Sequence, residues 1–530
     1  MSYAWLVKIL WLASAFFDYA EFTYLWQKGD YGVRKIRQFL LSHEGRVFWT
    51  QYHILWRSFF GLALFVSPLN NVSAVWYILT VIFVADLIYN LYRVASRHFE
   101  WPRITLKSLV TIFLCLLFEG GVCMYLHDWT FLFLFIALRF FILGGVITAL
   151  KLPTRLLKSY VVGRATRKLM NYKNLLVIGV VGSYGKSTVK EFLRSILADK
   201  FKVVAVPSKI RTDIAVARYI LANDLTDAQI LVVEMSGARP GYVSALARMT
   251  RPQIGILTGV NAQHISYFGS LEKIVKDKYN LFKFVPENGL AVINADKNFC
   301  PKCLAEVHCP IYTYGVDDEN KPQFLIDDIK HGIDSITFRA IVDGERVEYR
   351  APVSGEHNAL NIAAGCAVGR HLGMTQIEVT EAIGRLHLPE GVHDKYVLGD
   401  TIIIDDSENS NYEGFKSALF VLGSYSSEYH KIVITRGMTE LGEHSEKIHH
   451  NIGEEISFVA DELVVTSRDF FEVIRDGVGN RFNTTTALIE TEKDLLSYLK
   501  SVSGGKAVIL IENSISWRIK NYYRNTFKRI

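Results

Sequence analysis

The sequence predicts a helical membrane domain followed by two α/β units, of which the first is a P-loop ATPase domain with a doubly wound parallel sheet. Five long apolar stretches lie within the first 150 of the 530 residues. A glycine-rich segment follows, in the order strand, loop and helix. Short apolar runs then alternate with helical patterns as far as the C-terminus, which is the rhythm of parallel βαβ units. The last unit is the smaller one and is expected to be Rossmann-like.

The predicted membrane domain occupies residues 1–150. Each apolar stretch approaches the roughly 20 residues that a helix needs to cross a bilayer. The stretches are 5–26, 52–69, 73–92, 108–126 and 129–150. Asp18 and Glu21 interrupt the first stretch, and no small-residue cleavage site follows it, so we expect a retained helix in place of a cleaved signal peptide.

Basic residues predict the orientation of the five stretches. They gather in alternate loops and after the fifth stretch, and such loops face the cytoplasm. They are Arg34, Lys35, Arg37, Arg46, Arg93, Arg97, Arg103, Lys107, Lys151, Arg155, Lys158, Arg164, Arg167 and Lys168. We therefore expect a multi-pass protein of the cell membrane with its catalytic domains in the cytoplasm. The net charge of +6 is concentrated beside the membrane, which favours lipid headgroups over nucleic acid as partners.

Ionisable residues also lie inside the apolar stretches. They are Lys8, Asp18, Glu21, Arg57, Asp86, Glu119 and Arg139. Charged groups are costly in hydrocarbon and usually pair or line a polar cavity. One interpretation is structural pairing, for instance of Glu119 with Arg139 or of Asp86 with Arg57. The other is a site for a lipid headgroup or substrate.

The segment Gly179–Thr188 predicts a phosphate-binding loop. Leu175–Val181 is an apolar run suited to a buried parallel strand, and helical spacing follows the loop. Glycines let backbone N–H groups point at a polyphosphate, and the helix N-terminus adds the positive end of its dipole. Lys186 and Ser187 would contact the terminal phosphates and Mg²⁺. The strict pattern has glycine where this chain has Val180.

Two α/β units follow a basic juxtamembrane linker at 151–174. The central ATP-binding domain, 175–390, has strand-like runs at 175–181, 230–233, 254–257 and 290–293. The C-terminal domain, 391–530, has them at 401–404, 431–435, 462–465 and 507–511. The segment 388–391, Leu-Pro-Glu-Gly, is the expected hinge.

Motifs in both α/β units resemble those of the Mur ligases, in particular those of the MurF type. In order, they are Gly179–Thr188, Val233–Gly241, Gly259–Ser270, Lys276–Lys278, Ile293–Asp296, Tyr314–Gly315, Gly355–Asn361, Asp405–Asn411 and Glu440–Glu443. The resemblance does not extend to the front of the chain. The apolar stretches stand where the family has a domain that holds a UDP-sugar.

The resemblance implies an ATP-dependent ligase that forms an amide through an acyl phosphate and releases ADP and phosphate. It implies that Lys186 and Ser187 hold the phosphates and a first Mg²⁺, together with Gly182, Ser183, Gly185 and Thr188. Glu234 and His264 would bind Mg²⁺. Lys278 would be carbamoylated and act as a carboxylate-like metal ligand. Carbamoylation requires a neutral amine and hence a lowered lysine pKa.

The resemblance also assigns the nucleotide contacts. Asn358 and Asn361 would contact adenine, and their three-residue spacing places both amides on one helix face. Asp406 would lie near the ribose, and Asn294 would lie close to the nucleotide. Ser407, Asn409 and Asn411 would form the loop between ATP and the amine.

Two positions depart from the family pattern. Val392-His393 stands after Gly391, where the family has arginine near the nucleotide. Glu512-Asn513-Ser514 replaces a MurF-type Lys-Gly-Ser, which removes a cation from the region that binds the incoming amino acid or dipeptide. The sequence therefore does not assign D-Ala-D-Ala as the amine.

The six cysteines do not suggest a disulfide framework in a cytoplasmic domain. Cys300, Cys303, His308 and Cys309 could offer four zinc ligands, but the usual second Cys-x-x-Cys pair is missing. We expect reduced, packed thiols here in preference to zinc.

Two function classes remain open. The favoured one is a membrane-anchored amide ligase that joins an amine to a carboxylate-bearing cell-wall or surface-polymer precursor, which is lipid-linked or delivered at the membrane. The alternative is a nucleotide-regulated membrane module, either a transporter subunit or a scaffold descended from an inactive ligase. Glu234, His264 and Lys278 favour the ligase, because a scaffold has no need for them.

Overall fold

The computed structural model forms two compact units, Met1–Lys158 and Ser159–Ile530. The structure describes residues 3–29, 31–41, 72–96, 98–125, 130–237, 239–261, 263, 265–296, 300–332, 334–389, 391–407, 411–439, 441–479, 484–513 and 515–529. The described residues of the first unit form helices, and those of the second form two β-sheets with helices packed on them. The fold class is therefore the one that the sequence predicts.

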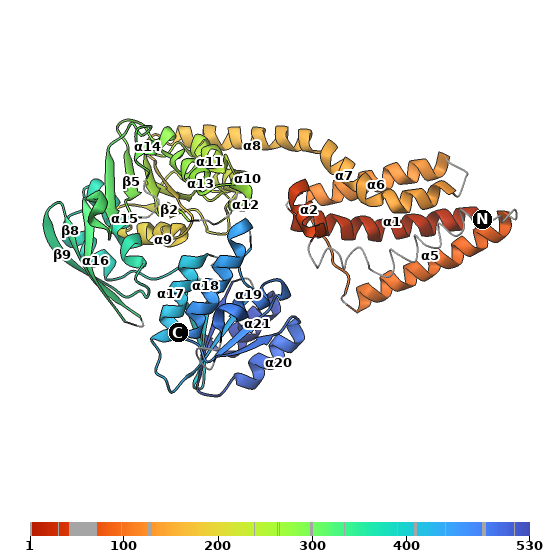
Figure 1. Cartoon of the computed structure of the whole chain (residues 1–530). Coiled ribbons are helices and arrows are strands. Elements are labelled where there is room, and N and C mark those ends of the chain that lie inside the picture. The colour runs from red at the N-terminus through yellow and green to blue at the C-terminus, as the bar shows by residue number, and fades with distance from the viewer. Residues whose placement is uncertain are drawn as a thin grey trace. The chain divides into compact units, whose positions relative to one another are not determined.

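The described part of the first unit contains four long apolar helices and one short basic helix, α2 (Figure 1). Its elements are α1 (Tyr3–Lys28), α2 (Val33–Leu41), α5 (Val72–Ala95), α6 (Leu106–Tyr125) and α7 (Thr130–Ala149), and α8 (Lys151–Asn171) continues into the second unit. Among the described residues, three segments are long and apolar enough to cross a membrane: Tyr77–Ala95, Leu106–Tyr125 and Leu138–Asn171.

Five membrane-crossing helices were expected, and these three segments overlap the last three of them. The first expected stretch is indeed helical, as α1, but it is not among the three, and Lys8, Asp18 and Glu21 lie in it. The second expected stretch, 52–69, lies outside the described residues.

A buried arginine joins three helices of the first unit. The Arg139 side chain on α7 is fully buried; its Nε donates to Glu119 Oε1 of α6 at 2.9 Å and its Nη1 to Asp18 Oδ2 of α1 at 2.8 Å. The expected pairing of Glu119 with Arg139 is confirmed, and Asp18 is a second partner. Arg93 likewise donates two hydrogen bonds to Glu21, at 3.1 and 2.6 Å. The other expected partner, Arg57, lies outside the described residues.

Replacing Arg139 with leucine should destabilise the first unit, because two buried carboxylates would lose the cation that compensates them. Breaking a buried ion pair from one side costs about 3–5 kcal/mol. Thermal unfolding of the detergent-solubilised protein measures the effect. Arg155→Leu is the matched control, because Arg155 is exposed on α8 and its loss should leave the melting temperature unchanged. An unchanged melting temperature for Arg139→Leu would refute this role.

The second unit begins with a nine-stranded sheet of order β2-β3-β1-β4-β5-β6-β7-β8-β9. Its strands are β1 (Leu176–Val181), β2 (Val203–Ala205), β3 (Ile230–Glu234), β4 (Ile254–Leu257), β5 (Leu290–Asn294), β6 (Ile311–Gly315), β7 (Phe324–His331), β8 (Ile336–Val342) and β9 (Glu345–Ala351). Pairing is parallel as far as β7, and β8 and β9 continue antiparallel.

Helices cover both faces of this sheet, as a doubly wound fold requires. The helices are α9 (Lys186–Leu197), α10 (Asp213–Ala222), α11 (Tyr242–Thr250), α12 (Ile265–Phe268), α13 (Leu271–Tyr279), α14 (Pro301–Leu304), α15 (Asn358–His371) and α16 (Gln376–Ile383). Apolar side chains of α9, α15 and α16 fill one core. Those of α10, α11 and α13, with the end of α8, fill the other.

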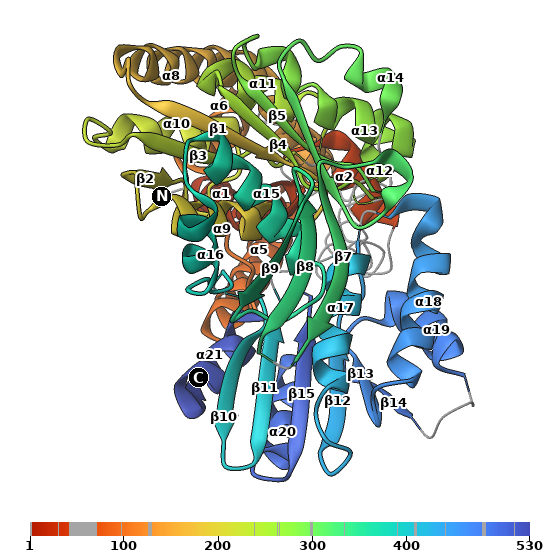
Figure 2. The ribbon, with the colours of Figure 1, turned by 90° about the vertical axis from the view of Figure 1, so that its left-hand side faces the viewer.

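The remaining residues form a seven-stranded sheet of order β14-β13-β12-β15-β11-β10-β16. Its strands are β10 (Asp394–Leu398), β11 (Thr401–Asp406), β12 (His430–Thr435), β13 (Glu462–Val465), β14 (Thr485–Leu488), β15 (Ala507–Glu512) and β16 (Lys528–Arg529). Strands β10 and β16 are the antiparallel ones. Figure 2 shows β10, β11, β15 and β12 side by side.

Two groups of helices enclose this second sheet. The helices α17 (Tyr412–Gly423), α18 (Ser445–Ser457) and α19 (Arg468–Val478) pack on one face, and α20 (Glu492–Val502) and α21 (Trp517–Thr526) pack on the other. Strand β15 lies between β11 and β12, although it follows both in sequence. The carboxyl ends of these strands therefore meet where the strand order reverses, which is where open α/β sheets bind ligands.

Candidate active site

The loop between β1 and α9 turns at two glycines. Gly182 has φ +155°, and a Cβ there would lie 2.0 Å from Thr258 Oγ1. Gly185 has φ +74°, and a Cβ there would lie 2.5 Å from Asn361 Oδ1. Any side chain at either position would collide with its neighbour, so the loop needs both glycines. Val180 lies in β1 and is fully buried, which explains why valine fits where the strict loop pattern has glycine.

Hydrogen bonds clamp this loop to the residues that follow β4. The Ser183 backbone N–H donates to Gly259 O at 2.7 Å, and Thr258 Oγ1 donates to Tyr184 O at 2.5 Å. The Asn261 backbone N–H donates to Ser183 Oγ at 3.1 Å. The loop is therefore held in place before any ligand arrives.

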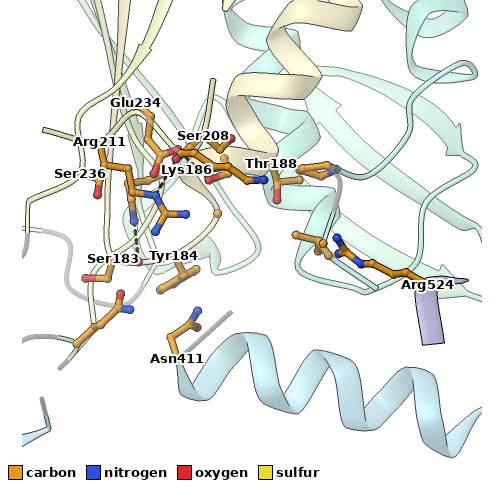
Figure 3. A pocket seen from close by; sticks show the side chains of 17 residues that line it. Ser183, Tyr184, Lys186, Thr188, Ser208, Arg211, Glu234, Ser236, Asn411 and Arg524 are labelled. Atoms are coloured by element: carbon orange, nitrogen blue, oxygen red, sulfur yellow. Dashed lines mark hydrogen bonds between the residues drawn. The ribbon is translucent and has the colours of Figure 1, made fainter. Parts of the chain in front are cut away.

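Lys186, Ser187 and Glu234 meet beside the loop, and Figure 3 shows Lys186 and Glu234 there. Lys186 Nζ donates to Ser183 O at 2.8 Å, and Ser187 Oγ donates to Glu234 Oε2 at 2.8 Å. Burial lowers the pKa of Lys186 to about 8; Glu234 opposes this shift, and the positive charges of Lys278 and Arg211 add to it. A desolvated ammonium of this kind gains most from an incoming anion.

The three side chains line a cavity of about 190 Å³, to which residues of both α/β domains contribute. Figure 3 shows Arg211 and Ser208 on one side and Arg524 of α21 and Asn411 on the other. The described residues that line it are Ser183–Thr188, Ser208, Lys209, Arg211, Glu234, Ser236, Gln263, Pro389, Gly391, Val392, Asn411 and Arg524. Four cations and one carboxylate make this lining strongly positive, which suits a polyphosphate.

A lysine within α9 anchors one wall of the cavity. The Lys190 side chain is fully buried, and its Nζ donates to Val206 O at 2.8 Å and to Ser208 Oγ at 2.5 Å. These bonds hold the loop that carries Lys209 and Arg211. Lys190 was not among the residues expected at the site, although its position one helical turn after Lys186 places both lysines on the same face of the helix.

Comparisons with known proteins identify the domain around this cavity. The Mur ligase middle domain matches residues 180–369. The chain belongs to the Mur ligase family. It is 27% identical over 368 residues to the UDP-N-acetylmuramoyl-tripeptide–D-alanyl-D-alanine ligase of Haemophilus influenzae, covering 68% of this chain and 78% of that one. It is 26% identical over 353 residues to the Escherichia coli enzyme of the same name, covering 66% and 76%.

Solved structures agree with this assignment. MurF ligase from Thermotoga maritima in complex with ADP aligns with a TM-score of 0.60 and 25% identity, over 70% of this chain and 83% of that chain. MurF from Acinetobacter baumannii aligns with a TM-score of 0.62 and 19% identity, over 70% and 80%. This protein is thus an ATP-dependent, MurF-like peptide ligase of the Mur family.

Two further residues of this Mur ligase were expected at the metals. Lys278 on α13 is 3% exposed, and its ammonium lies 5.9 Å from the centre of the Phe268 ring. Burial lowers its pKa, while Asp277 opposes the shift. Lys276, two residues earlier, is exposed. His264 lies outside the described residues.

The four residues expected to contact the adenosine part of the nucleotide are all described, but none of them lines the cavity. They are Asn294, Asn358, Asn361 and Asp406. Asn294 Nδ2 donates to Thr258 O at 2.7 Å, so it supports the loop through Thr258. Asn361 Nδ2 donates to Asn358 Oδ1 at 2.8 Å, and Asn361 Oδ1 lies against Gly185. Asp406 ends β11 and is fully buried.

The departures from the family pattern have structural counterparts. Val392 lines the cavity, and His393 follows it with φ +51°. Asn513 adopts φ +70°. Asparagine tolerates this left-handed conformation better than most residues, so it can replace the glycine of the family motif. Glu512 is 2% exposed at the end of β15.

The loop that was expected between ATP and the amine is described in part. Ser407 and Asn411 are described, and Asn409 is not.

The expectation of reduced thiols is wrong for two cysteines. Cys300 and Cys303 form a disulfide, with their Cα atoms 5.2 Å apart. Cys300 caps the N-terminus of α14, so the Cys-x-x-Cys spacing brings the two sulfurs together. Cys309 is a buried free thiol.

Proposed function

We propose that this Mur ligase is anchored in the cell membrane and joins an amine, either an amino acid or a peptide, to the carboxylate of a cell-envelope precursor. The observation that carries the proposal is the cationic cavity over the glycine-rich loop, with Lys186, Ser187 and Glu234 at its centre. The related enzymes are D-alanyl-D-alanine ligases for a UDP-N-acetylmuramoyl tripeptide. We leave the amine open because Glu512 replaces the lysine of the family motif.

The residues present fit ATP and magnesium. Glycine has no Cβ, so the space that a Cβ would fill at Gly182 and Gly185 stays open. The backbone there can therefore approach phosphates closely. The Ser187 hydroxyl and the Glu234 carboxylate, 2.8 Å apart, are the hard oxygen ligands that Mg²⁺ prefers. Bound magnesium would neutralise part of the charge that builds up on the phosphates.

The reaction crowds negative charge into the cavity. An oxygen of the acceptor carboxylate attacks the γ-phosphorus of ATP, the bond to the β-phosphate oxygen breaks, and ADP leaves. The amine then attacks the acyl carbon, phosphate leaves, and the nitrogen loses a proton. Lys186 and Arg211 would stabilise the charge on the transferring phosphoryl group. Arg524 would bring a third positive charge from helix α21 of the C-terminal domain.

Lys278 would complete the site as a carbamate. The neutral amine would add to CO₂ and lose a proton, which replaces a cation with two anionic oxygens. Burial of Lys278 supports this proposal, because it lowers the pKa and so raises the fraction of neutral amine. His264 would be a further metal ligand, and Asn294, Asn358, Asn361 and Asp406 would hold the nucleotide.

Three apolar segments support the membrane anchor. The last of them, Leu138–Asn171, includes the basic helix α8, and such basic segments gather on the cytoplasmic side. A precursor on a lipid diphosphate would arrive in the plane of this membrane with its carboxylate on the cytoplasmic side. Anchoring the ligase there raises the effective concentration of such an acceptor.

Ligase activity predicts ADP release that depends on both an amine and a carboxylate acceptor. The full-length protein in detergent should release ADP only when ATP, acceptor and amine are all present, and ADP and amide should form in equal amounts. A coupled ADP assay with mass spectrometry of the product measures both. Nucleotide binding without any amide product would favour the scaffold or transporter alternative.

Lipid-linked and soluble acceptors should be used differently. In proteoliposomes, we expect kcat/KM to favour the lipid-linked precursor over its soluble nucleotide counterpart by on the order of 10²-fold. Removing the first unit should abolish this preference; residues 159–530 form a compact unit of their own, so the truncated protein is a reasonable comparison. Equal use of the soluble acceptor by both proteins would contradict a role for the helices in acceptor choice.

A further inference from the structure

Glu512 occupies a central position in the C-terminal sheet. It is the last residue of β15, and it pairs in register with Asp406 of β11 and Thr435 of β12. Figure 2 shows β15 between these two strands. Glu512 therefore lies at the carboxyl edge of the sheet where the strand order reverses, beside the carboxylate that is proposed to contact the nucleotide.

The Glu512 carboxyl group is buried without a donor. Its side chain is 2% exposed, and neither of its oxygens accepts a hydrogen bond from any described residue. Its contact is with the carboxyl group of Asp406, which is fully buried. Burial and the two neighbouring carboxylates, Asp406 and Asp405, raise the pKa of Glu512 well above the usual range.

The surrounding charged groups have other partners. Arg524 and Tyr523 of α21 both donate to Asp405 Oδ2, at 3.2 and 2.7 Å. His393 Nε2 lies 4.0 Å from Asp406 Oδ2, and burial lowers the pKa of His393 to about 3, so its ring is neutral at pH 7. Among the residues that the structure describes, the charged groups that face Glu512 are thus the two acidic residues of β11.

Two carboxyl groups in contact can form a hydrogen bond only if one of them holds a proton. A buried pair also resists losing its last proton, because two adjacent negative charges repel in a site with little water. Asp406 Oδ1 accepts a hydrogen bond from the His393 backbone N–H at 3.3 Å, which favours its ionised form. Glu512 receives no such bond from the described part of the chain, so the proton belongs on Glu512.

We propose that Glu512 is protonated at neutral pH and donates a hydrogen bond to Asp406, and so acts as a positioning residue for the nucleotide site. The second part rests on the proposed role of Asp406. A protonated glutamic acid supplies a donor at the position where the family motif has lysine, which is also a donor.

The same bond extends a polar chain between the two sheets. His393, in the segment that joins them, bonds through Nδ1 to Ser354 Oγ at 3.2 Å. The Ser354 carbonyl accepts from Asn358 Nδ2 at 2.6 Å. Asp406 is therefore connected to Glu512 on one side and, through His393, to the proposed adenine contact on the other.

Infrared difference spectroscopy tests the proton directly and needs no substrate. At pH 7 the full-length protein should show the carbonyl stretch of a protonated carboxyl group, and Glu512→Gln should lose it. Glu428→Gln, an exposed carboxylate of the same domain, should keep it. Identical spectra for wild type and Glu512→Gln would overturn the protonation. Because the measurement needs no turnover, it stands even if the proposed ligase activity fails.

Steady-state kinetics tests the positioning role. Glu512→Gln keeps an N–H donor towards Asp406, so KM for ATP should stay within about threefold of wild type. Glu512→Leu removes the donor and should raise KM for ATP by about tenfold, with a smaller change in kcat. Above the titration of the pair, wild type should lose ATP affinity as the pH rises, whereas Glu512→Gln should not. Equal KM values for Gln and Leu variants would overturn the positioning role; if the Leu variant does not fold, the pH comparison decides.

Discussion

Replacing Lys186 with alanine should abolish ADP formation while the protein stays folded. The Lys186 ammonium is held beside the glycine-rich loop by the Ser183 carbonyl, 2.8 Å away, and burial lowers its pKa to about 8 although Glu234 opposes the shift. Bound phosphates would add negative charge that favours the charged amine. Removing a preorganised charge from such a site costs about 3 kcal/mol or more in the barrier, which is a loss of over about 10²-fold in kcat.

A coupled ADP assay on the purified full-length protein measures this loss. Lys202→Ala is the matched control, because Lys202 is exposed before β2 and its loss should leave the rate unchanged. Thermal unfolding should show similar stability for both variants. Near-normal ADP release by Lys186→Ala would remove the basis for the phosphate-binding loop.

Local patterns predicted the central strands well. Each of the eight apolar runs named from the sequence coincides with a strand, from β1 to β15, with ends that differ by at most two residues. These strands are buried on both faces, so their sequences are continuously apolar and easy to recognise. Strands β8 and β9 were not predicted, because in them buried and exposed positions mix and the apolar signal is weaker.

The loop motif located the centre of the site but not its walls. Lys186 and Ser187 follow the glycines directly, and Glu234 ends the neighbouring strand β3, so one motif and one strand end were enough. Arg211 and Arg524 reach the same cavity from a loop after β2 and from α21. Nothing in their local sequence distinguishes them from surface arginines, and only the tertiary fold brings them to the phosphate side.

The cost of charge in a membrane predicted the ion pair of Glu119 with Arg139 but not the second carboxylate on Arg139. Charges inside apolar helices must be compensated, which led to the pairing of Glu119 with Arg139. The second carboxylate on Arg139, that of Asp18, comes from a helix more than a hundred residues away in the chain. The disulfide between Cys300 and Cys303 was missed for the opposite reason, because a general rule about compartments outweighed a local spacing.

Lys278→Ala should lose activity that small carboxylates partly restore. If the carbamate of Lys278 is a metal ligand, alanine removes both its anionic oxygens and the side chain that carries them. We expect kcat to fall by about 10²–10³-fold, as for loss of one preorganised electrostatic contact. Formate or acetate fits the vacated space and supplies two oxygens, so millimolar concentrations should recover at least about tenfold of the lost rate.

Matched variants make this rescue specific to the buried amine. Lys276→Ala removes an exposed lysine two residues away and should be fully active with or without formate. Lys186→Ala lacks a cation, which a carboxylate cannot replace, so formate should leave it inactive. Removing CO₂ from the buffer should slow the wild type but not the formate-rescued variant, because only the wild type needs the carbamate. If formate and acetate leave Lys278→Ala inactive while both controls behave as expected, Lys278 is a buried structural lysine and the carbamate has no part in catalysis.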